Sequence, residues 1–201
     1  MSKNKQSGWY KTETGAVAKI DSARSTQNWS QLASEIKNLQ EARIERATEA
    51  RNGKAVVVIQ ENTEGDFPVE GGRFLIRPPL VARDAAILNN AMKNAGVAAV
   101  VACREPVTSL GLCPIVALGS GVTARVQVKE PKNPTRPTCA WFDHALDELG
   151  QHVLEQLDEG APLERQLDFL IAHFSAIPTC INCYKRAIAL CKTLLNQSNV
   201  G

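Results

Sequence analysis

The chain has 201 residues, of which 44 % are hydrophobic and only 5 % aromatic, and its net charge is +2. This composition is typical of a globular protein with a mostly aliphatic core. The longest apolar run is far shorter than the roughly 20 residues of a membrane span, and the polar N-terminus lacks the apolar stretch of a secretory signal. We therefore expect a soluble, cytoplasmic protein without a membrane partner.

Charge is unevenly distributed along the sequence. Basic residues exceed acidic ones up to about residue 137, whereas the stretch 138–164 holds seven acidic residues and no lysine or arginine. Two interpretations stay open: both parts are simply solvated surfaces, or the basic part binds a polyanion. The pI of about 8.2 is below that of domains that bind duplexes on charge alone.

The first segment, residues 1–27, is rich in lysine, serine, threonine and glutamine. It offers too little apolar surface to offset the entropy of ordering, so we predict a flexible polar tail. Trp9 and Tyr10, next to Lys11, are the exception. Aromatic side chains beside lysines suit docking on the domain, on a partner or on unpaired bases.

The second segment, residues 28–137, is predicted to contain a helix and then an α/β core. Asn28 is a favourable N-cap, and Gln31 stands at the capping-box position three residues later. Apolar residues then recur at helical spacing, and Asn52-Gly53 supplies a stop signal.

The core is predicted to hold one βαβ unit. A continuous β-branched run over residues 54–60 predicts a strand buried on both faces. A short strand at 73–77, a helix capped by Asp84 and a buried strand at 97–103 follow within about thirty residues. The crossover between the last two strands should be right-handed.

A hairpin is predicted next, from 113–118 to 122–129 across a glycine-containing turn. Apolar and polar residues alternate along its second strand, so one face should be buried and the other exposed. Arg125 and Lys129 fall on the exposed face, and Lys132 and Arg136 continue this line in a proline-rich linker.

These cations and the aromatic residues of the tail form a candidate nucleic-acid-binding set, because spaced cations suit phosphates and aromatic rings stack on bases. The set is Lys11, Trp9, Tyr10, Arg125, Lys129, Lys132 and Arg136. The alternative is that the strand cations only protect an exposed sheet edge from pairing with another chain.

The third segment, residues 138–201, is predicted to be an acidic unit of three helices that packs on the core. Its first helix, 138–158, has an apolar stripe behind an acidic face. That stripe either holds the unit together or lies in the groove of a protein partner or a second copy. The chain as a whole is thus predicted to be α/β (or α+β), with a mixed sheet of about five strands, one βαβ crossover, an N-terminal helix and a C-terminal three-helix unit.

Cysteines supply the candidate chemistry. Cys180 and Cys183 have the spacing of a pair that chelates one metal ion, and His173 or Cys139 would have to complete a zinc site. The alternative is that these cysteines are small apolar residues of a helical core. A redox role is weaker because the pair lies between helices rather than after a strand.

A nucleophilic site is a further alternative. It would combine Cys103 or Cys139 with His144 or His152. Cys103 ends a predicted strand, where α/β proteins place chemistry, and the adjacent Arg104 would favour a thiolate.

The function that these observations favour is that of a non-catalytic binding or accessory protein that associates with nucleic acid through its basic strand and tail. One alternative is a small thiol- or zinc-dependent enzyme or regulatory module that uses the C-terminal cysteines. Another is a subunit for protein–protein interaction or assembly. No cofactor is expected, and zinc is the one candidate.

Overall fold

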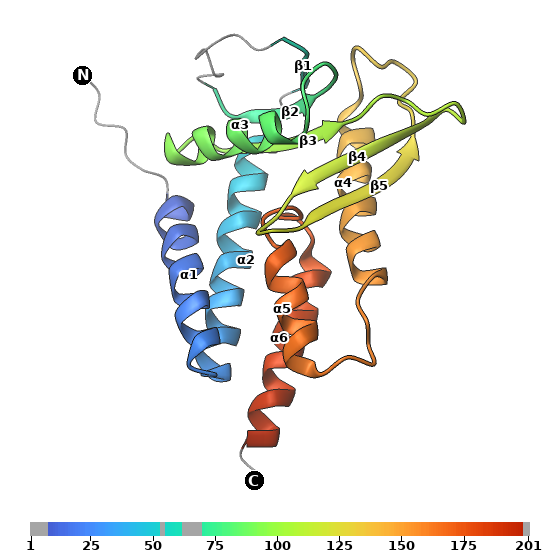
Figure 1. The fold of residues 1–201 in the computed structure, drawn as a ribbon. Coiled ribbons are helices and arrows are strands. Elements are labelled where there is room, and N and C mark those ends of the chain that lie inside the picture. Colours follow the sequence, from blue (N-terminus) through green and yellow to red (C-terminus); the bar gives the residue numbers. More distant parts are fainter. Residues whose placement is uncertain (1–7, 53–54, 62–69, 199–201) are drawn as a thin grey trace, which may run out of the picture.

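The computed structural model describes residues 8–52, 55–61 and 70–198. Within these ranges it contains six helices and one five-stranded sheet (Figure 1). The helices are α1 (Gly8–Ser25), α2 (Trp29–Arg51), α3 (Ala82–Asn94), α4 (Cys139–Glu155), α5 (Leu163–His173) and α6 (Ile181–Ser198). The strands are β1 (Val56–Ile59), β2 (Gly72–Ile76), β3 (Ala99–Arg104), β4 (Leu112–Leu118) and β5 (Thr123–Lys129). The predicted α/β fold is confirmed.

The strands lie in the sheet in sequence order, β1-β2-β3-β4-β5. The first three are parallel, whereas β4 joins β3 in antiparallel orientation and forms a hairpin with β5. Parallel neighbours need a crossover connection, and α3 supplies it between β2 and β3. Both the mixed sheet and this βαβ unit agree with the prediction.

Strand β1 lies at one edge of the sheet, and its Val57 is 47 % exposed. The prediction that this strand is buried on both faces is wrong. A β-branched run reports the preference for extended backbone, and it does not report whether a helix or another strand covers the residues.

Helix α1 corrects the prediction of a flexible tail, which is wrong for residues 8–25. The segment has a buried seam that contains Trp9, Ala16 and Ile20, and it packs lengthwise on α2. The seam also buries Glu13, which is only 2 % exposed. A composition count treats Glu13 as a surface residue. The segment therefore seemed too polar to pack against another helix. Residues 1–7 lie outside the described residues.

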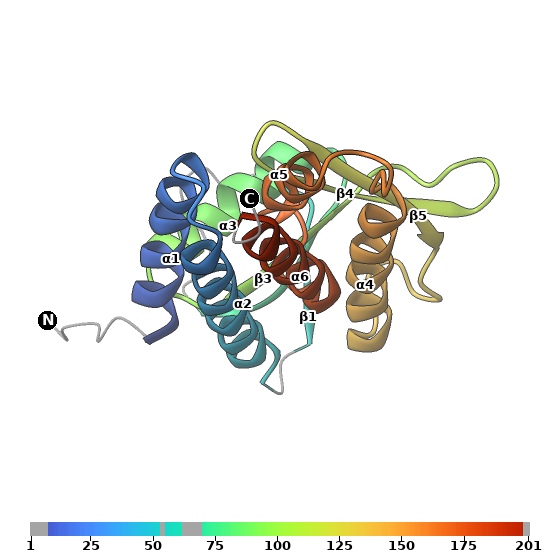
Figure 2. The same ribbon diagram turned by 90° about the horizontal axis from the view of Figure 1, so that it is seen from below.

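Helix α2 begins at the predicted cap, where the Oδ1 atom of Asn28 accepts a hydrogen bond of 3.1 Å from the backbone N–H of Gln31. It lies between α1 and α6, as the view along the helices shows (Figure 2). Its C-terminal half packs against β2 and β3. Side chains of α2 therefore reach from the helical part of the molecule to the sheet.

Different helices cover the two faces of the parallel strands. Leu75 and Val100 point to the side where α2 and the start of α4 pack. Phe74 and Cys103 point to the opposite side, which α3 covers. The alternation of side chains along a strand places these neighbours on opposite faces.

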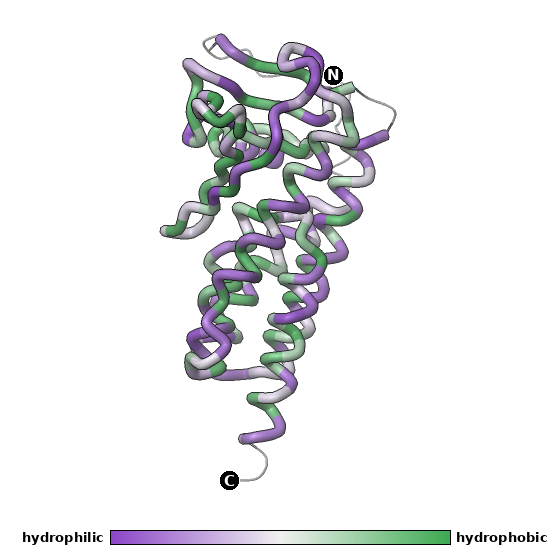
Figure 3. Tube along the Cα trace, turned by 90° about the vertical axis from the view of Figure 1, so that its right-hand side faces the viewer, coloured by the Kyte–Doolittle hydropathy of each residue, from purple (hydrophilic) through white to green (hydrophobic). Residues whose placement is uncertain are grey.

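The C-terminal helices pack on this chain. Helix α6 contacts α2 and α5, and α4 contacts β4 and β5. Ala145, Leu149 and Val153 of α4 share one hydrophobic cluster with residues of the hairpin, so the apolar stripe of the first acidic helix is covered within the same chain. The helices continue beyond the sheet toward the C-terminus (Figure 3). In the described ranges, no helix is both long enough and apolar enough to cross a membrane.

Candidate functional site

A pocket lies where β3 and β4 separate. Cys103 and Arg104 of β3 pair with Val116 and Ile115 of β4, and the ladder between these two strands ends there. Toward the start of β3 and the end of β4 the strands diverge. A cavity of about 410 Å³ lies there, lined by residues 99–101 of β3, which precede the paired residues, and residues 117–119, which follow them on β4 and in its turn. This volume lies within the range of about 300–1,000 Å³ that is usual for small-molecule sites.

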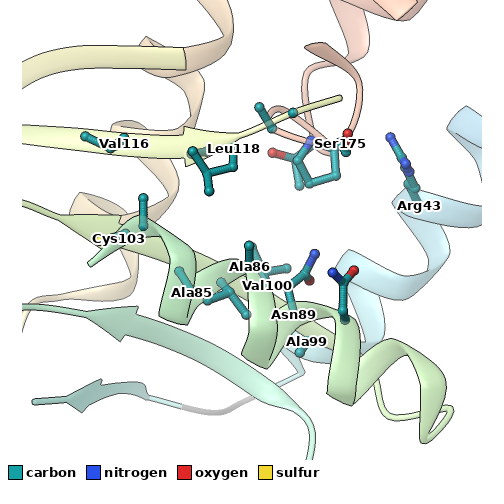
Figure 4. A pocket seen from close by; sticks show the side chains of 18 of the residues that line it. Arg43, Ala85, Ala86, Asn89, Ala99, Val100, Cys103, Val116, Leu118 and Ser175 are labelled. Carbon is teal, nitrogen blue, oxygen red and sulfur yellow. The ribbon is translucent and has the colours of Figure 1, made fainter. Parts of the chain in front are cut away.

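Five segments build the walls: α2, α3, β3, β4 with its turn, and the loop between α5 and α6. Figure 4 shows Cys103 and Val116 at one end, and Arg43 and Ser175 at the other. The wall from α3 presents alanines and the amide side chain of Asn89. Short side chains on this helix leave the space open.

Gly119 holds the diverging end of β4 in place. A Cβ atom there would lie 2.5 Å from the carbonyl oxygen of Ala172, which is closer than side chains tolerate. The neighbouring Ser120 donates its backbone N–H to that same oxygen at 3.0 Å. The turn of the hairpin is therefore fixed on the end of α5 rather than on β3, and this keeps the two strands apart.

The polar end of the pocket is a buried charge cluster. Arg43 and Arg46 are 7 % and 4 % exposed, one helical turn apart on α2. Glu13 faces both: its Oε1 atom accepts from Nε of Arg43 at 3.0 Å, and its Oε2 atom lies 3.1 Å from Nη1 of Arg46. In the part of the chain that the structure describes, Glu13 is the only carboxylate paired with either arginine.

The two arginines differ in how well the protein compensates their buried positive charge. Nη1 of Arg43 donates to the Tyr184 hydroxyl at 2.8 Å and to the Phe174 carbonyl oxygen. Burial acts to lower the pKa of Arg43, but the Tyr184 hydroxyl and the Glu13 carboxylate outweigh it and raise the pKa. Arg43 thus has one carboxylate and two further hydrogen-bond acceptors within the fold.

Arg46 lacks this support. Within the described residues its guanidinium makes an ion pair with Glu13 and lies over the Trp9 ring, 5.8 Å from the ring centre, but it has no hydrogen bond. Burial, together with the positive charge of Arg43, lowers the pKa of Arg46 despite Glu13. A buried cation is costly unless an anion and hydrogen bonds satisfy it. Since Arg46 lines the pocket, an anion in the pocket would supply both.

The opposite end of the pocket contains Cys103, the candidate nucleophile. Burial, with smaller effects from Glu105 and Asp84, raises the pKa of this thiol to about 12. His144 and His152 are on α4 and pair with Glu148 and Glu155 at distances of 3.8 and 4.0 Å. Neither histidine lines the pocket, so the structure does not bring Cys103 together with either of them.

The residues of the candidate nucleic-acid set do not come together. Trp9 is fully buried, and its Nε1–H donates to Glu49 at 2.9 Å, so its ring is not available to stack on a base. Tyr10 is half-buried against Trp9, and Lys11 is exposed on α1.

The cations on and after β5 share their exposure to solvent. Arg125, Lys129, Lys132 and Arg136 are all exposed. Arg125 donates to the carboxylate of Glu105 at 2.6 Å. Because β5 is an edge strand, these residues also fit the alternative role of protecting the edge.

The zinc ligands suggested by the sequence are likewise dispersed. The Sγ atoms of Cys180 and Cys183 are 2.7 Å apart, beside Gly150 of α4. Cys139 precedes that glycine by eleven residues, or about 16 Å along a helix. His173 is buried with its Nδ1 2.8 Å from the Phe169 carbonyl oxygen. Among the described residues no three side chains of His, Cys, Asp or Glu are placed to share a metal ion.

The sequence reasoning missed Glu13, Arg43 and Arg46. One signal was available: Arg43 and Arg46 are spaced like two members of the buried stripe of α2, between Leu39 and Ala50. Arginine at such positions is more often solvated, and Glu13 was assigned to a tail.

Comparisons with known proteins identified no relative. No protein-family model matches the chain, and no curated protein or solved structure matches it significantly.

Proposed function

We propose that the protein binds a small organic anion in the pocket between α3 and β4. The observation that carries this proposal is Arg46, a buried arginine that has no hydrogen bond to any described residue and lines a cavity of about 410 Å³. A carboxylate or phosphate group would take the place opposite the arginine. Bonds between ionised donors and acceptors are the strongest hydrogen bonds in proteins, so this contact would dominate recognition.

The rest of the pocket suits the body of such a ligand. Alanines of α3 and residues of the two strands provide an apolar wall, whereas Asn89 and Asn90 add amide groups. Asn90 and Ser175 are exposed, so they form the rim through which a ligand enters. A ligand with one anionic end and a flat or apolar body matches this division.

Binding is a better match to the lining than acid–base catalysis. Among the described lining residues there is no histidine, aspartate or glutamate. The thiol of Cys103 has a raised pKa of about 12 and stays protonated at neutral pH. The pocket therefore offers hydrogen-bond donors and a cation, but no group that exchanges a proton readily near pH 7.

Phenyl phosphate is a suitable probe, because it has an anionic end and an apolar ring. We expect it to bind measurably in a calorimetric titration and to raise the melting temperature, whereas the neutral analogue benzyl alcohol should bind much more weakly. Arg46→Gln should weaken binding at least about tenfold, since a hydrogen bond to a charged group contributes about 1.5–3 kcal/mol.

The matched control is Arg83→Gln, an exposed arginine on α3 that does not line the pocket. It should leave the affinity unchanged. Equal affinity of the wild type and Arg46→Gln for phenyl phosphate would contradict the proposal, as would equal binding of the anion and its neutral analogue.

A second candidate function is weak association with single-stranded nucleic acid through the β5 cations. The observation in its favour is the exposure of four cations, Arg125, Lys129, Lys132 and Arg136. We expect retention on immobilised single-stranded DNA at low salt that falls with rising salt and disappears when the four residues are made glutamine. Lack of retention at low salt would reject this function, and it would leave the pocket proposal untouched.

A further inference from the structure

A second site lies on the other side of the α5–α6 loop, around Cys180 and Cys183. Cys180 directly precedes the first residue of α6, and Cys183 lies in its first turn. Residues three apart at a helix start lie on one side of the helix. Their Sγ atoms are 2.7 Å apart, so the pair needs only a small movement to form a disulfide.

The two thiols differ in access. Cys183 is fully buried, and its Sγ atom lies 3.6 Å from the backbone carbonyl oxygen of Gly150. Cys180 is half-buried and lines a surface cavity of about 420 Å³ between α4 and α6. A reagent from solution therefore meets Cys180 first, and Cys183 stands behind it.

Helix α4 is shaped around this pair. A Cβ atom at Gly150 would lie 2.8 Å from both Cβ and Sγ of Cys180. Glycine inside a helix costs about 1 kcal/mol relative to alanine, and here it is what lets the two helices approach at the cysteines. The sequence thus accepts a weaker α4 at the position where space for Cys180 is needed.

The electrostatics, like the geometry, favour Cys180 as the thiol that reacts first. The hydrogen bond from the Cys183 thiol, aided by the backbone N–H groups of Asn182 and Cys183, lowers the pKa of Cys180 even though burial opposes this. The interaction with Cys180 and burial both raise the pKa of Cys183. Asp147, Glu148 and Lys185 are the charged groups around the cavity.

We infer that Cys180 and Cys183 form a redox-active dithiol that exchanges with a small-molecule disulfide, which is an activity separate from the anion pocket. Sγ of Cys180 attacks one sulfur of the disulfide, forms a mixed disulfide and releases the first thiolate. Cys183 then gives up its proton to solvent and attacks Sγ of Cys180, which releases the second thiolate. The protein loses two electrons and two protons, and the disulfide becomes two thiols.

The cavity supports a small reactant. Glu148, Gln151 and Lys185 supply both charge signs and an amide around Cys180, which suits a zwitterionic peptide disulfide. The remaining buried cysteines do not compete. Burial raises the pKa of all three: that of Cys113, that of Cys191 to about 11 and that of Cys103 to about 12. Few of these thiols therefore ionise near neutral pH.

Oxidised glutathione is the probe that tests this inference. After incubation of the reduced protein, acid quenching and alkylation, peptide mass spectrometry should find a disulfide between Cys180 and Cys183. Cys183→Ser should instead accumulate glutathione on Cys180, because the second attack is lost. Cys180→Ser should give neither product.

Cys139→Ser is the matched control, since Cys139 is also half-buried at the start of a helix; it should react like the wild type. In the wild type, a maleimide should label Cys180 faster than Cys139 at neutral pH, because the hydrogen bond from Cys183 lowers the pKa of Cys180. Circular dichroism checks the fold, and Cys183→Ala replaces the serine variant if that does not fold. Absence of the internal disulfide, or glutathione on Cys139 in preference to Cys180, would overturn the inference.

Discussion

Two groups of basic side chains lie at opposite extremes of exposure in this molecule. Arg43 and Arg46 are buried at the end of the pocket with a single carboxylate between them. Arg125 and Lys129 stand on the outer face of β5 in contact with water. The same chemical groups therefore carry very different energies. An exposed cation is solvated whether or not it has a partner. A buried cation needs partners, and the chain supplies them to Arg43 more completely than to Arg46.

The largest effect should come from the shared carboxylate. Glu13→Gln leaves two buried guanidinium groups without a counter-charge, and we expect a loss of about 3–5 kcal/mol in the free energy of unfolding. Glu105→Gln, which removes the partner of the exposed Arg125, should cost less than about 1 kcal/mol. Urea denaturation of both variants measures the difference. Similar losses would show that the buried cluster is solvated after all.

The next variant separates stability from binding. Arg46→Met keeps the Glu13–Arg43 pair and removes the less compensated cation, so we expect a change of less than about 2 kcal/mol in the free energy of unfolding. The same variant should lose affinity for phenyl phosphate. If Arg46→Met unfolds as readily as Glu13→Gln, the arginine is structural, and the argument for an anionic ligand fails.

The comparison of buried and exposed groups extends to the thiols. The raised pKa of Cys103, about 12 instead of 9, means that the unfolded chain releases this proton at lower pH than the fold does. Its contribution to stability is complete below about pH 9 and is lost as the pH rises toward 12. Cys103→Ala should flatten the alkaline fall of stability in that window. A slope equal to that of the wild type would argue against burial as the cause.

The smallest expected effect on stability comes from the exposed lysines of β5 and the segment after it. Neutralising Lys129 and Lys132 should leave the free energy of unfolding within about 0.5 kcal/mol of the wild type, because both side chains are solvated. Their removal should still reduce the salt dependence of any retention on single-stranded DNA. A loss of stability comparable to that of Glu13→Gln would mean that this strand face is packed rather than exposed.

Local patterns in the sequence were sufficient for most of the fold. The alternation along β5 predicted which side chains face water, and the structure places Ala124 and Val128 inside and Arg125 and Lys129 outside. The cap at Asn28 predicted where α2 begins. Such features depend on neighbours close in sequence, so a single chain records them directly.

Features that depend on distant partners could not be predicted in this way. The burial of Glu13 requires arginines thirty or more residues away, and without them α1 looks like a tail. The pocket requires two strands that diverge and a turn fixed on α5, none of which leaves a spacing in the sequence. The position of Cys180 depends on a glycine of another helix. In each case the deciding interaction joins segments that the sequence separates.

Thr179 joins the two proposed sites and would couple them thermodynamically. This residue lines the anion pocket and also the cavity at Cys180, so the two sites share a wall one residue from the reactive sulfur. If closing the disulfide moves that wall, the affinity for the anion must change. Linkage is reciprocal: bound anion would then shift the reduction potential of the cysteines by the same free energy. A titration of that potential with and without phenyl phosphate reads the coupling directly.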